Sequence, residues 1–484
     1  MNYARGLLYL LLFNPCLYGQ EEEDTEPFIH LTNHELTLGH ETLPYTAITG
    51  FCPILREEGK IADLFFIAYE LDDEENRPIT FVLPGGPGGA GTIQSILTFG
   101  PRRLLTAHEG RTVLPPYQLI DNPETLLKET DLVFIDPINC GFSSATELAN
   151  LSRLYSVDGD VEVLAEMIHS LIRLGNRWNS PIYLLGGSYG TLRACGIACA
   201  LSQRYGILPS GMILNGCAFE FSTLVSERDQ ALADCLLIPT FAATAWYHKR
   251  LFPEKSLEEV VDYARRFAYD EYAPYMLQPS RLSYVEKLVF EENFATLIGL
   301  PKGVVRRYNA RIDEKIYSQE FFGSERKVLG RLDSRYSGDV FTVDPDDAHD
   351  PSYLDSLGYQ PAFNAYLQKE LDTNLFLTPY LSFSSDASIH WDYQTYDSFG
   401  IPGLLQRLRQ VLILNPLAKV FIGSGYYDCR TPFAATEYCF DHLGLPENYT
   451  KNLQFEYYKA GHGWLFDYPS LKKWKQDLVK FYKK

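Results

Sequence analysis

The chain has 484 residues, of which 46% are hydrophobic and 22% charged, a composition that leaves little room for extended disorder. At this length we expect one large domain with a sizeable insertion, or two domains. The formal net charge is −19, and no Lys/Arg-rich run is present to form the basic patch that a nucleic-acid partner needs.

The N-terminal segment has the features of an export signal. Arg5 provides a positive flank, residues 6–13 (GLLYLLLF) form a short apolar run, and Gly19 is a small residue at a potential cleavage point. The apolar run is far shorter than the roughly 20 residues that cross a bilayer, so we expect no stable membrane span. The sequence therefore predicts a signal peptide over residues 1–19 and an exported mature chain, periplasmic or secreted.

Short strands come next. Residues 45–54, 62–71 and 78–83 are rich in β-branched and aromatic residues and are joined by short polar turns, which predicts antiparallel neighbours. Strands predicted at 131–136, 181–185 and 211–214 then alternate with helices at 161–174 and 189–202. Strands at 418–423 and 453–458 and a closing helix from about 469 to 484 resume this alternation. The pattern indicates an α/β fold with a mostly parallel central sheet and helices on both faces.

The middle of the chain differs in character. Residues 218–410 are aromatic-rich and mainly helical in pattern, with Pro, Gly and Asp breaks around 342–359. We interpret this stretch as a cap inserted between two strands of the sheet, covering the site from above. The predicted organisation is a first core segment at 20–217, the inserted cap at 218–410 and a second core segment at 411–484.

The sequence GGSYG at 186–190 fits the pattern Gly-x-Ser-x-Gly. The outer glycines relieve crowding in a sharp strand-to-helix turn that lifts the serine hydroxyl clear of the sheet. An apolar strand ends at this motif and a small-residue helix follows it, which is the context that such a turn requires. We predict Ser188 as a nucleophile, the alternative being a plain glycine turn.

A second glycine-rich segment, PGGPGGAG at 84–91, follows the strand at 78–83. Glycine lets backbone N–H groups approach a developing oxyanion without a Cβ in the way. A phosphate cradle is a poor alternative because no Gly-Lys-Ser/Thr follows. We predict that the N–H groups of Gly86 and Tyr189 form an oxyanion hole, a tight loop without a ligand being the alternative.

Two later loops carry the remaining catalytic candidates. His462 lies in AGHG at 460–463, after the last strand and before the last helix, and Asp428 follows the strand at 418–423. The chain order Ser, Asp, His is the order that the α/β-hydrolase fold requires. We therefore predict a triad of Ser188 as nucleophile, His462 as general base and Asp428 as the acid that orients the histidine. We expect no metal and no cofactor.

Together these segments resemble the serine carboxypeptidase family, especially its bacterial members. The resemblance is carried by GGPG at 85–88, DPINCGFS at 136–143, GGSYG at 186–190, GYYD at 425–428 and AGH at 460–462. It covers most of the mature chain and implies an acyl-enzyme mechanism. In that mechanism Ser188 attacks a carbonyl, His462 relays its proton to the leaving group, and water then releases the acyl part.

The sequence departs from the family pattern where family members hold the C-terminal carboxylate of the substrate. They carry Asn before Gly-Gly-Pro-Gly, Glu before the catalytic serine and a second Glu before a Gly-Pro pair, the glutamates being protonated at acid pH. Here these positions are Pro84, Gly187 and, by spacing, Thr98. The usual clamp is therefore missing, and Arg193 is a candidate replacement that could pair directly with a carboxylate, as are the arginines at 102 and 103. A surface or structural role is the alternative for each of these three arginines.

Three functions follow as hypotheses. The first is a peptidase of the serine carboxypeptidase type without the usual clamp. The second is an aminopeptidase or small-ester esterase on the same triad, since GGPG with GGSYG also resembles proline- and tripeptidyl-aminopeptidases. The third is a non-catalytic hydrolase-fold binding protein, against which the intact triad argues. The expected partner is a peptide or small acyl substrate, and the sequence leaves the oligomeric state open.

Overall fold

The computed structural model describes residues 27–71, 76–90, 92–106, 114–226, 230–340, 350–356, 358–394 and 405–483. The signal peptide predicted at 1–19 lies outside these residues. None of the helices in the described part of the chain combines the length and apolar character of a bilayer-spanning segment.

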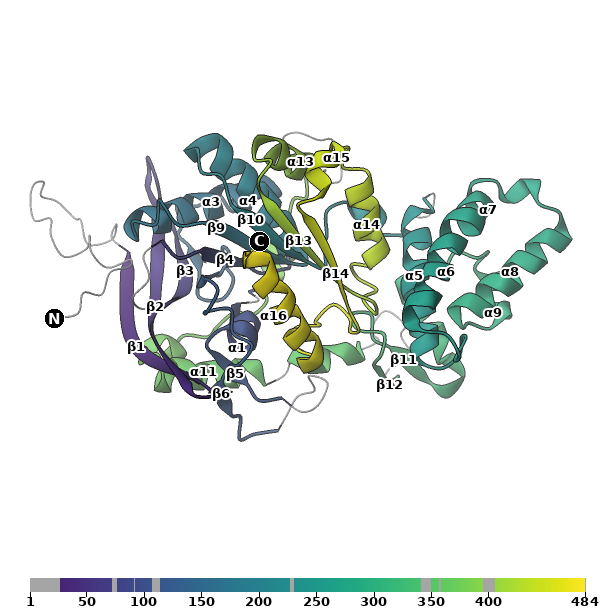
Figure 1. The fold of residues 1–484 in the computed structure, drawn as a ribbon, viewed down its shortest axis with the longest axis horizontal. Coiled ribbons are helices and arrows are strands. Elements are labelled where there is room, and N and C mark those ends of the chain that lie inside the picture. The colour runs from purple at the N-terminus through teal and green to yellow at the C-terminus, as the bar shows by residue number, and fades with distance from the viewer. Residues whose placement is uncertain are drawn as a thin grey trace, which may run out of the picture.

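The core is a ten-stranded sheet whose main path runs β1-β2-β3-β7-β4-β9-β10-β13-β14, with β8 (Ser144–Ala145) paired to β3 (Figure 1). The first four strands of this path are antiparallel, and all pairings from β7 to β14 are parallel. The strands of the path are β1 (Phe28–Leu38), β2 (Glu41–Arg56), β3 (Gly59–Leu71), β4 (Ile79–Leu83), β7 (Asp131–Ile135), β9 (Ile182–Gly187), β10 (Gly211–Asn215), β13 (Lys419–Gly425) and β14 (Leu453–Tyr458). This mixed, mostly parallel sheet confirms the predicted α/β-hydrolase fold.

One sequence-based prediction about the sheet is wrong. The strand at 78–83 was expected as an antiparallel neighbour of the strand at 62–71, but β7 lies between β3 and β4. Every residue of β4 is buried, as in β7 and β10. A strand buried on both faces belongs in the interior of a parallel sheet, which explains why β4 pairs in parallel with β7 and β9.

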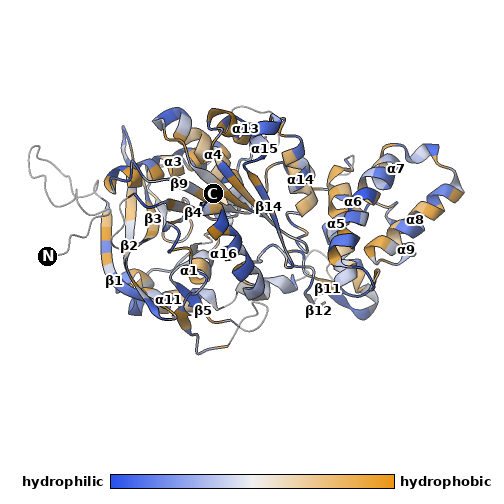
Figure 2. Ribbon diagram, viewed as in Figure 1, coloured by the Kyte–Doolittle hydropathy of each residue, from blue (hydrophilic) through white to orange (hydrophobic). Residues whose placement is uncertain are grey.

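Helices cover both faces of the sheet. On one face lie α3 (Val157–Leu174), α4 (Tyr189–Tyr205) and α13 (Leu405–Leu414), and on the other α1 (Thr92–Phe99), α11 (Tyr359–Lys369) and α16 (Tyr468–Lys483). Figure 2 shows apolar residues concentrated in the central strands and stretches of polar residues along helices such as α16. Gly196 allows α4 to pack closely on α3, because a Cβ there would lie 2.6 Å from Cγ2 of Val161.

The inserted region has two parts with different surroundings. Residues 232–321, here called the helical lobe, project from one end of the core (Figure 1) and enclose an apolar core of their own. The lobe contains α5 (Leu232–Tyr247), α6 (Leu257–Phe267), α7 (Ala273–Leu277), α8 (Tyr284–Ile298), α9 (Lys302–Arg307) and α10 (Glu314–Phe321). The later part returns to the core, where α11 packs on α1 and α13 packs on α4. By its packing, α13 is thus a core helix that begins before residue 411.

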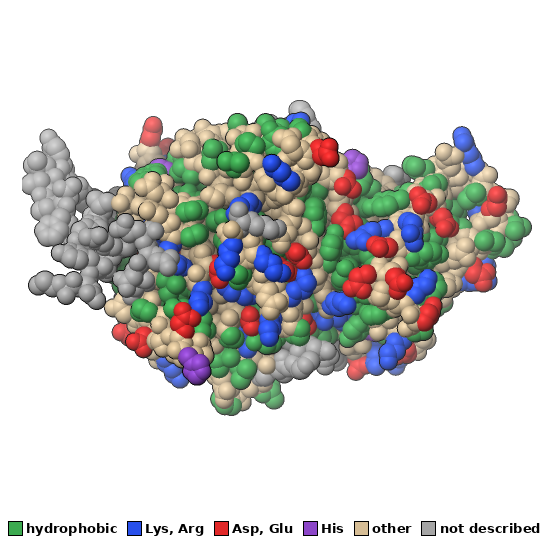
Figure 3. All heavy atoms as spheres, in the orientation of Figure 1, with side chains coloured by type: hydrophobic (Ala, Val, Ile, Leu, Met, Phe, Trp, Pro, Cys, Tyr) green, Lys and Arg blue, Asp and Glu red, His purple; other side chains and the backbone are tan. Residues whose placement is uncertain are grey.

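The surface carries both signs of charge. On the face shown in Figure 3, Lys and Arg side chains are interspersed with Asp and Glu over the core and the helical lobe. Several ion pairs join the two parts. Arg265 on α6 lies 2.5 Å from Glu437 on α14 (Phe433–Asp441), Glu258 on α6 lies 3.3 Å from Lys459, and Glu314 on α10 pairs with Arg430.

Candidate active site

Ser188 occupies a sharp turn between β9 and α4. Its backbone has φ 56° and ψ −127°, a conformation that non-glycine residues rarely adopt and that is found at functional sites. A Cβ at Gly186 would lie 2.0 Å from the carbonyl oxygen of Gly190, and a Cβ at Gly190 would lie 2.3 Å from that of Leu83. The backbone N–H of Ser188 donates to the carbonyl of Asn215 at 2.8 Å. These contacts explain why the flanking glycines are needed and how the serine is held at the carboxyl end of the sheet.

The glycine-rich loop after β4 lies directly against this turn. A Cβ at Gly85 would lie 3.1 Å from Cβ of Ser188, and Gly86 has φ +123°, a conformation suited to glycine. The N–H groups of Gly86 and Tyr189 donate to no backbone carbonyl among the described turns, loops and caps. Tyr189 begins α4, so its N–H has no acceptor within the helix. Neither N–H group thus has a backbone acceptor among these described contacts, and both lie in the loop and turn where the oxyanion hole is predicted.

Asp428 lies in the loop after β13 and is completely buried. Its Oδ1 accepts hydrogen bonds from the N–H groups of Arg430 at 2.8 Å and Thr431 at 2.9 Å. Its Oδ2 accepts from the Thr431 hydroxyl at 2.6 Å and lies 2.7 Å from Nδ1 of His462. Burial alone would raise the pKa of Asp428, but His462 and these hydrogen bonds hold the pKa below its ordinary value. An ionised Asp428 therefore orients the imidazole with Nδ1–H toward the carboxylate and Nε2 free.

Ser188 and His462 open onto the same cavity, which has a volume of about 870 Å³. A Cβ at Gly216 would lie 3.5 Å from the ring of His462, and the preceding Asn215 binds the N–H of Ser188. The last residue of β10 thus holds the backbone of Ser188, and the residue that follows it lies against the ring of His462. Among the described contacts, the hydrogen bonds of the His462 side chain go to Asp428 and Thr431 and none joins it to Ser188. Such nucleophile–base contacts commonly tighten only when substrate binds.

The cavity wall is largely apolar. Apolar and aromatic side chains come from the core strands and helices, and further lining comes from the later part of the insertion, at Leu332, Tyr353, residues 358–361 and residues 382–383. No Asp, Glu, Lys or Arg occurs among the described residues that line it. The covering of the site thus comes from the segments after the helical lobe, whereas the sequence suggested the whole insertion. Large aromatic contributors to the wall are Phe99, Tyr359, Phe383, Trp464 and Phe466.

Three of the four predicted substrate-binding positions, Pro84, Thr98 and Gly187, line this cavity. A Cβ at Gly187 would have its nearest neighbour at 4.0 Å, so a side chain there could extend into the space. Thr98 is almost completely buried, at 3% exposure. These three positions, where the sequence predicts substrate contacts, therefore surround the same space as Ser188.

Arg193 does not lie in the cavity. Its side chain is completely buried and its guanidinium pairs with Asp160 at 2.7 Å. It also donates to the carbonyl oxygens of Pro84 at 2.6 Å and Gly85 at 2.9 Å. Arg193 thus holds the glycine-rich loop in place through its carbonyl groups. Because its guanidinium is already bonded to these carbonyls and to Asp160, it is not available to bind a substrate carboxylate.

The arginines at 102 and 103 are also engaged elsewhere. Arg102 forms ion pairs with Asp121 and Glu370, and the guanidinium of Arg103 lies over the ring of Tyr468, 4.5 Å from its centroid. Neither arginine is among the described residues that line the cavity. Within the described part of the chain, no group of three or more His, Cys, Asp or Glu side chains is placed to hold a metal ion.

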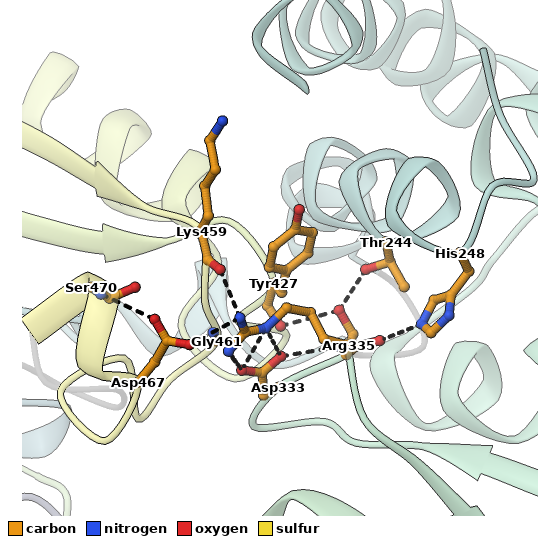
Figure 4. A network of polar contacts seen from close by, with 10 residues as sticks. Thr244, His248, Asp333, Arg335, Tyr427, Lys459, Gly461, Asp467 and Ser470 are labelled. Carbon is orange, nitrogen blue, oxygen red and sulfur yellow. Dashed lines mark hydrogen bonds and ion pairs between the residues drawn. The ribbon is translucent and has the colours of Figure 1, made fainter. Parts of the chain in front are cut away.

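Sequence reasoning missed two sets of residues that hold Asp428 and His462 in place. Thr431, three residues after Asp428, contacts both Asp428 and the histidine ring. A segment of the insertion, residues 331–335, contacts the loop of His462 (Figure 4). In the sequence, the glycine before His462 could have indicated a close contact at this loop. A Cβ at Gly461 would lie 2.3 Å from the carbonyl oxygen of Leu332.

Comparison with known proteins adds a family match. Residues 39–216, which include the glycine-rich loop and Ser188, match the family profile described as serine carboxypeptidase. Solved structures with a similar arrangement include an enantioselective mutant of an epoxide hydrolase from Aspergillus niger (14% identity, TM-score 0.34, covering 90% of this chain and 78% of that chain). VinJ is another (11% identity, TM-score 0.39, covering 90% of this chain and 98% of that chain). A third is a peroxisomal α/β-hydrolase from Saccharomyces cerevisiae (9% identity, TM-score 0.34, covering 94% of this chain and 89% of that chain).

Proposed function

Because the chain belongs to the serine carboxypeptidase family, whose members are serine-type peptidases, we propose that it is an exported hydrolase cleaving peptides without the family's usual carboxylate clamp. The observation that carries the proposal is the shared cavity of Ser188 and His462, with the histidine bound to Asp428 at 2.7 Å. The family match and this arrangement support the same reaction type, acyl transfer to a serine.

In the proposed reaction the hydroxyl of Ser188 attacks the scissile carbonyl carbon while Nε2 of His462 takes its proton. Asp428 stabilises the imidazolium that forms, and the N–H groups of Gly86 and Tyr189 bind the oxyanion. His462 then protonates the leaving amine, which departs and leaves an acyl-enzyme. Water, activated by the same histidine, releases the acyl group and regenerates Ser188.

The proposed loss of the carboxylate clamp rests on three cavity positions. Proline at 84 has no N–H, and its carbonyl oxygen accepts from Arg193, so this position offers no donor to the substrate. Gly187 has no side chain, and Thr98 is shorter than glutamate. The apolar wall supports binding of uncharged, apolar groups beside Ser188. A free C-terminal carboxylate is therefore not expected to be a requirement.

The test is an activity-based labelling experiment combined with a peptide-library digest. A fluorophosphonate probe should label the wild type and leave Ser188→Ala unlabelled. A library containing free and amidated C-termini, read by mass spectrometry, should be cleaved in both forms at comparable rates. Equal labelling of both proteins would refute the nucleophile, whereas cleavage restricted to free C-termini would refute the missing clamp alone.

The apolar cavity also favours a second candidate, an esterase acting on small acyl esters. Such an enzyme would use the same triad and place an apolar acyl group against the aromatic wall. Ready hydrolysis of p-nitrophenyl esters without any peptide cleavage in the library would select this candidate. A strict need for an unblocked N-terminus would instead select the aminopeptidase.

The proposed export depends on the N-terminal sequence. The positive flank at Arg5 and the apolar run at 6–13 are the supporting features. N-terminal sequencing of the mature protein from the cells that make it should begin at residue 20. A mature protein that retains residues 1–19 would argue against cleavage.

A further inference from the structure

One segment of the insertion is bonded to both loops that carry the catalytic acid and base. Residues 331–335, here called the clasp, lie between β11 (Lys327–Leu329) and β12 (Ser337–Asp339). On the side of the Asp428 loop, the N–H and hydroxyl of Ser334 donate to the carbonyl of Tyr427 at 3.0 and 3.1 Å. The N–H of Cys429 donates to the carbonyl of Arg331 at 3.1 Å. Both sequence neighbours of Asp428 are thus tied to the clasp.

The clasp holds the His462 loop as well. The N–H of His462 donates to the carbonyl of Leu332 at 2.5 Å, and the N–H of Gly461 donates to Oδ2 of Asp333 at 2.8 Å. A Cβ at Gly461 would lie 2.4 Å from Cα of Asp333, so the two segments are in close contact. The clasp therefore holds the backbone of Gly461 and His462, which sets the position of the imidazole ring.

The contact with the His462 loop is reinforced by a buried ion pair. Arg335 donates through Nε and Nη2 to the two carboxylate oxygens of Asp333, at 3.0 and 2.7 Å, and the side chains are 9% and 7% exposed. Nη1 of Arg335 reaches the carbonyl of Lys459 at 2.9 Å and Asp467 at 3.3 Å. Burial alone would lower the pKa of Arg335, but Asp333 and Asp467 raise it above its ordinary value, so the guanidinium stays charged. Figure 4 shows Arg335 between Asp333 and the strand end at Lys459.

The clasp is also attached to the helical lobe. On α5, the hydroxyl of Thr244 lies 2.5 Å from that of Ser334, and Nε2 of His248 lies 2.9 Å from the carbonyl oxygen of Ser334. Burial lowers the pKa of His248, which favours a neutral ring donating from Nε2. The contacts in Figure 4 thus run from α5 through the clasp to the loop of the catalytic histidine.

From this geometry we propose that Asp333 and Arg335 are positioning residues for the reaction. They hold the loops of Asp428 and His462 at the spacing that the Nδ1–carboxylate hydrogen bond requires. The role goes beyond the proposed substrate and rests only on the triad being catalytic. It predicts a defect in the chemical step, because a catalytic group displaced by about 1 Å can lose about 10²-fold in rate.

The test compares Asp333→Asn with a matched buried carboxylate, Asp131→Asn. Asp131 begins β7, at the sheet edge opposite Ser188, and pairs with Arg77 at 3.0 Å with side chains 3% and 4% exposed. Each variant is purified, checked for folding by circular dichroism, and assayed with one ester substrate. Asp333→Asn should lower kcat about 10²-fold with KM little changed, and slow fluorophosphonate labelling in proportion. Asp131→Asn should keep the kcat and labelling rate of the wild type below its melting temperature.

Proton NMR adds a second measurement, the Nδ1–H resonance of His462, which should not change if Asp333 only stabilises the fold. The low-field Nδ1–H resonance of His462 should move or broaden in folded Asp333→Asn and stay in place in Asp131→Asn. If Asp333→Asn does not fold, Arg335→Lys is compared with Arg77→Lys instead. Lysine keeps the positive charge but cannot make the two parallel hydrogen bonds of a guanidinium. Equal kcat, equal labelling and an unchanged resonance in the two members of a pair would overturn the proposal. Failure of wild-type labelling would instead refute the proposed function.

Discussion

At the scale of single residues, Asp428 shows how a completely buried carboxylate is kept ionised. Two backbone N–H groups and the hydroxyl of Thr431 donate to it, and the histidine completes its shell. Each donor stabilises the charged form, so together they outweigh the cost of burial. The sequence indicated the acid but not this shell, because Thr431 looks like any other threonine in a loop.

The stability contribution of Asp428 should therefore depend on pH. Its pKa is lower in the folded than in the unfolded chain, so its contribution is fully present above the unfolded pKa of about 4 and is lost as pH falls through the folded pKa. Urea denaturation of the wild type and Asp428→Asn should show a difference in unfolding free energy that is constant above about pH 5 and changes, to the disadvantage of the wild type, toward pH 2. A difference that is independent of pH would contradict this expectation.

A glutamate at position 187 should favour substrates with a free C-terminal carboxylate. The position faces the cavity beside Ser188, and a Cβ there meets nothing closer than 4.0 Å. Below about pH 4.5 the carboxyl of Gly187→Glu is protonated and can donate to the C-terminal carboxylate of a substrate. The ratio of kcat/KM for free over amidated peptides should rise about 10-fold at pH 4 relative to wild type, one hydrogen bond to a charged group being about 1.5–3 kcal/mol. Gly187→Gln is the control; its ratio should not depend on pH between 4 and 7.

At the scale of elements, the nucleophile turn depends on contacts between β9, α4 and the loop after β4. Gly186 and Gly190 each pack against a backbone carbonyl, at distances that no Cβ tolerates. Gly187, which lies between Gly186 and Ser188, differs from Gly186 and Gly190 because a Cβ at this position would have no neighbour closer than 4.0 Å. In the pattern Gly-x-Ser-x-Gly, packing thus requires glycine at positions 186 and 190. At position 187 packing also allows a larger side chain.

This difference predicts opposite outcomes for two adjacent glycines. Gly186→Ala should destabilise the fold by about 3 kcal/mol or more, because its Cβ would lie 2.0 Å from the carbonyl oxygen of Gly190. Gly187→Ala should change the unfolding free energy by less than about 1 kcal/mol and leave probe labelling in place. Chemical denaturation of both variants decides the matter, and a comparable loss in the two would contradict the packing argument.

The elements that sequence predicted well are those whose signals are local. The strand at 182–187 and the helix from Tyr189 follow from an apolar run, a glycine motif and a small-residue helix within a short stretch. The position of β4 was missed because neighbours in a sheet are set by crossovers, which short links do not reveal. The clasp was missed for a related reason: Asp333 and Gly461 are 128 positions apart and share no motif. Arg193 was misread because its partner, Asp160, lies on a different helix.

At the scale of the whole molecule, the helical lobe has its own core and a limited set of contacts with the sheet domain. Phe294 is 1% exposed, and its ring centroid lies 5.0 to 6.1 Å from those of Phe267, Tyr272 and Phe290. The lobe contacts the rest of the chain through α5, which packs on α14 and bonds to the clasp, and through α10, which packs on β11. Ion pairs of Arg265 with Glu437, Glu258 with Lys459 and Glu314 with Arg430 add to these contacts. Such a body is expected to unfold as a cooperative unit of its own.

Phe294→Ala should therefore loosen the lobe selectively. Truncating a buried phenylalanine costs about 3–5 kcal/mol. Amide hydrogen exchange should accelerate in α6 and α8, while β4, β9 and β10 keep their protection. Probe labelling of Ser188 should persist in folded protein. A uniform loss of protection through the sheet would show that lobe and core unfold together.

The parallel pairing of β10 with β13 has a consequence for the order of assembly during synthesis. The two strands are adjacent in the sheet, yet the whole insertion lies between them in the chain. Ser188 and the glycine-rich loop leave the ribosome early, whereas Asp428, His462 and β14 arrive last. A nascent chain thus carries a nucleophile without its base. Joining strands across so long a loop adds little entropic cost, because that cost grows only with the logarithm of loop length. The proposed triad can therefore be complete only once the chain has been synthesised past β14 and the loop of His462.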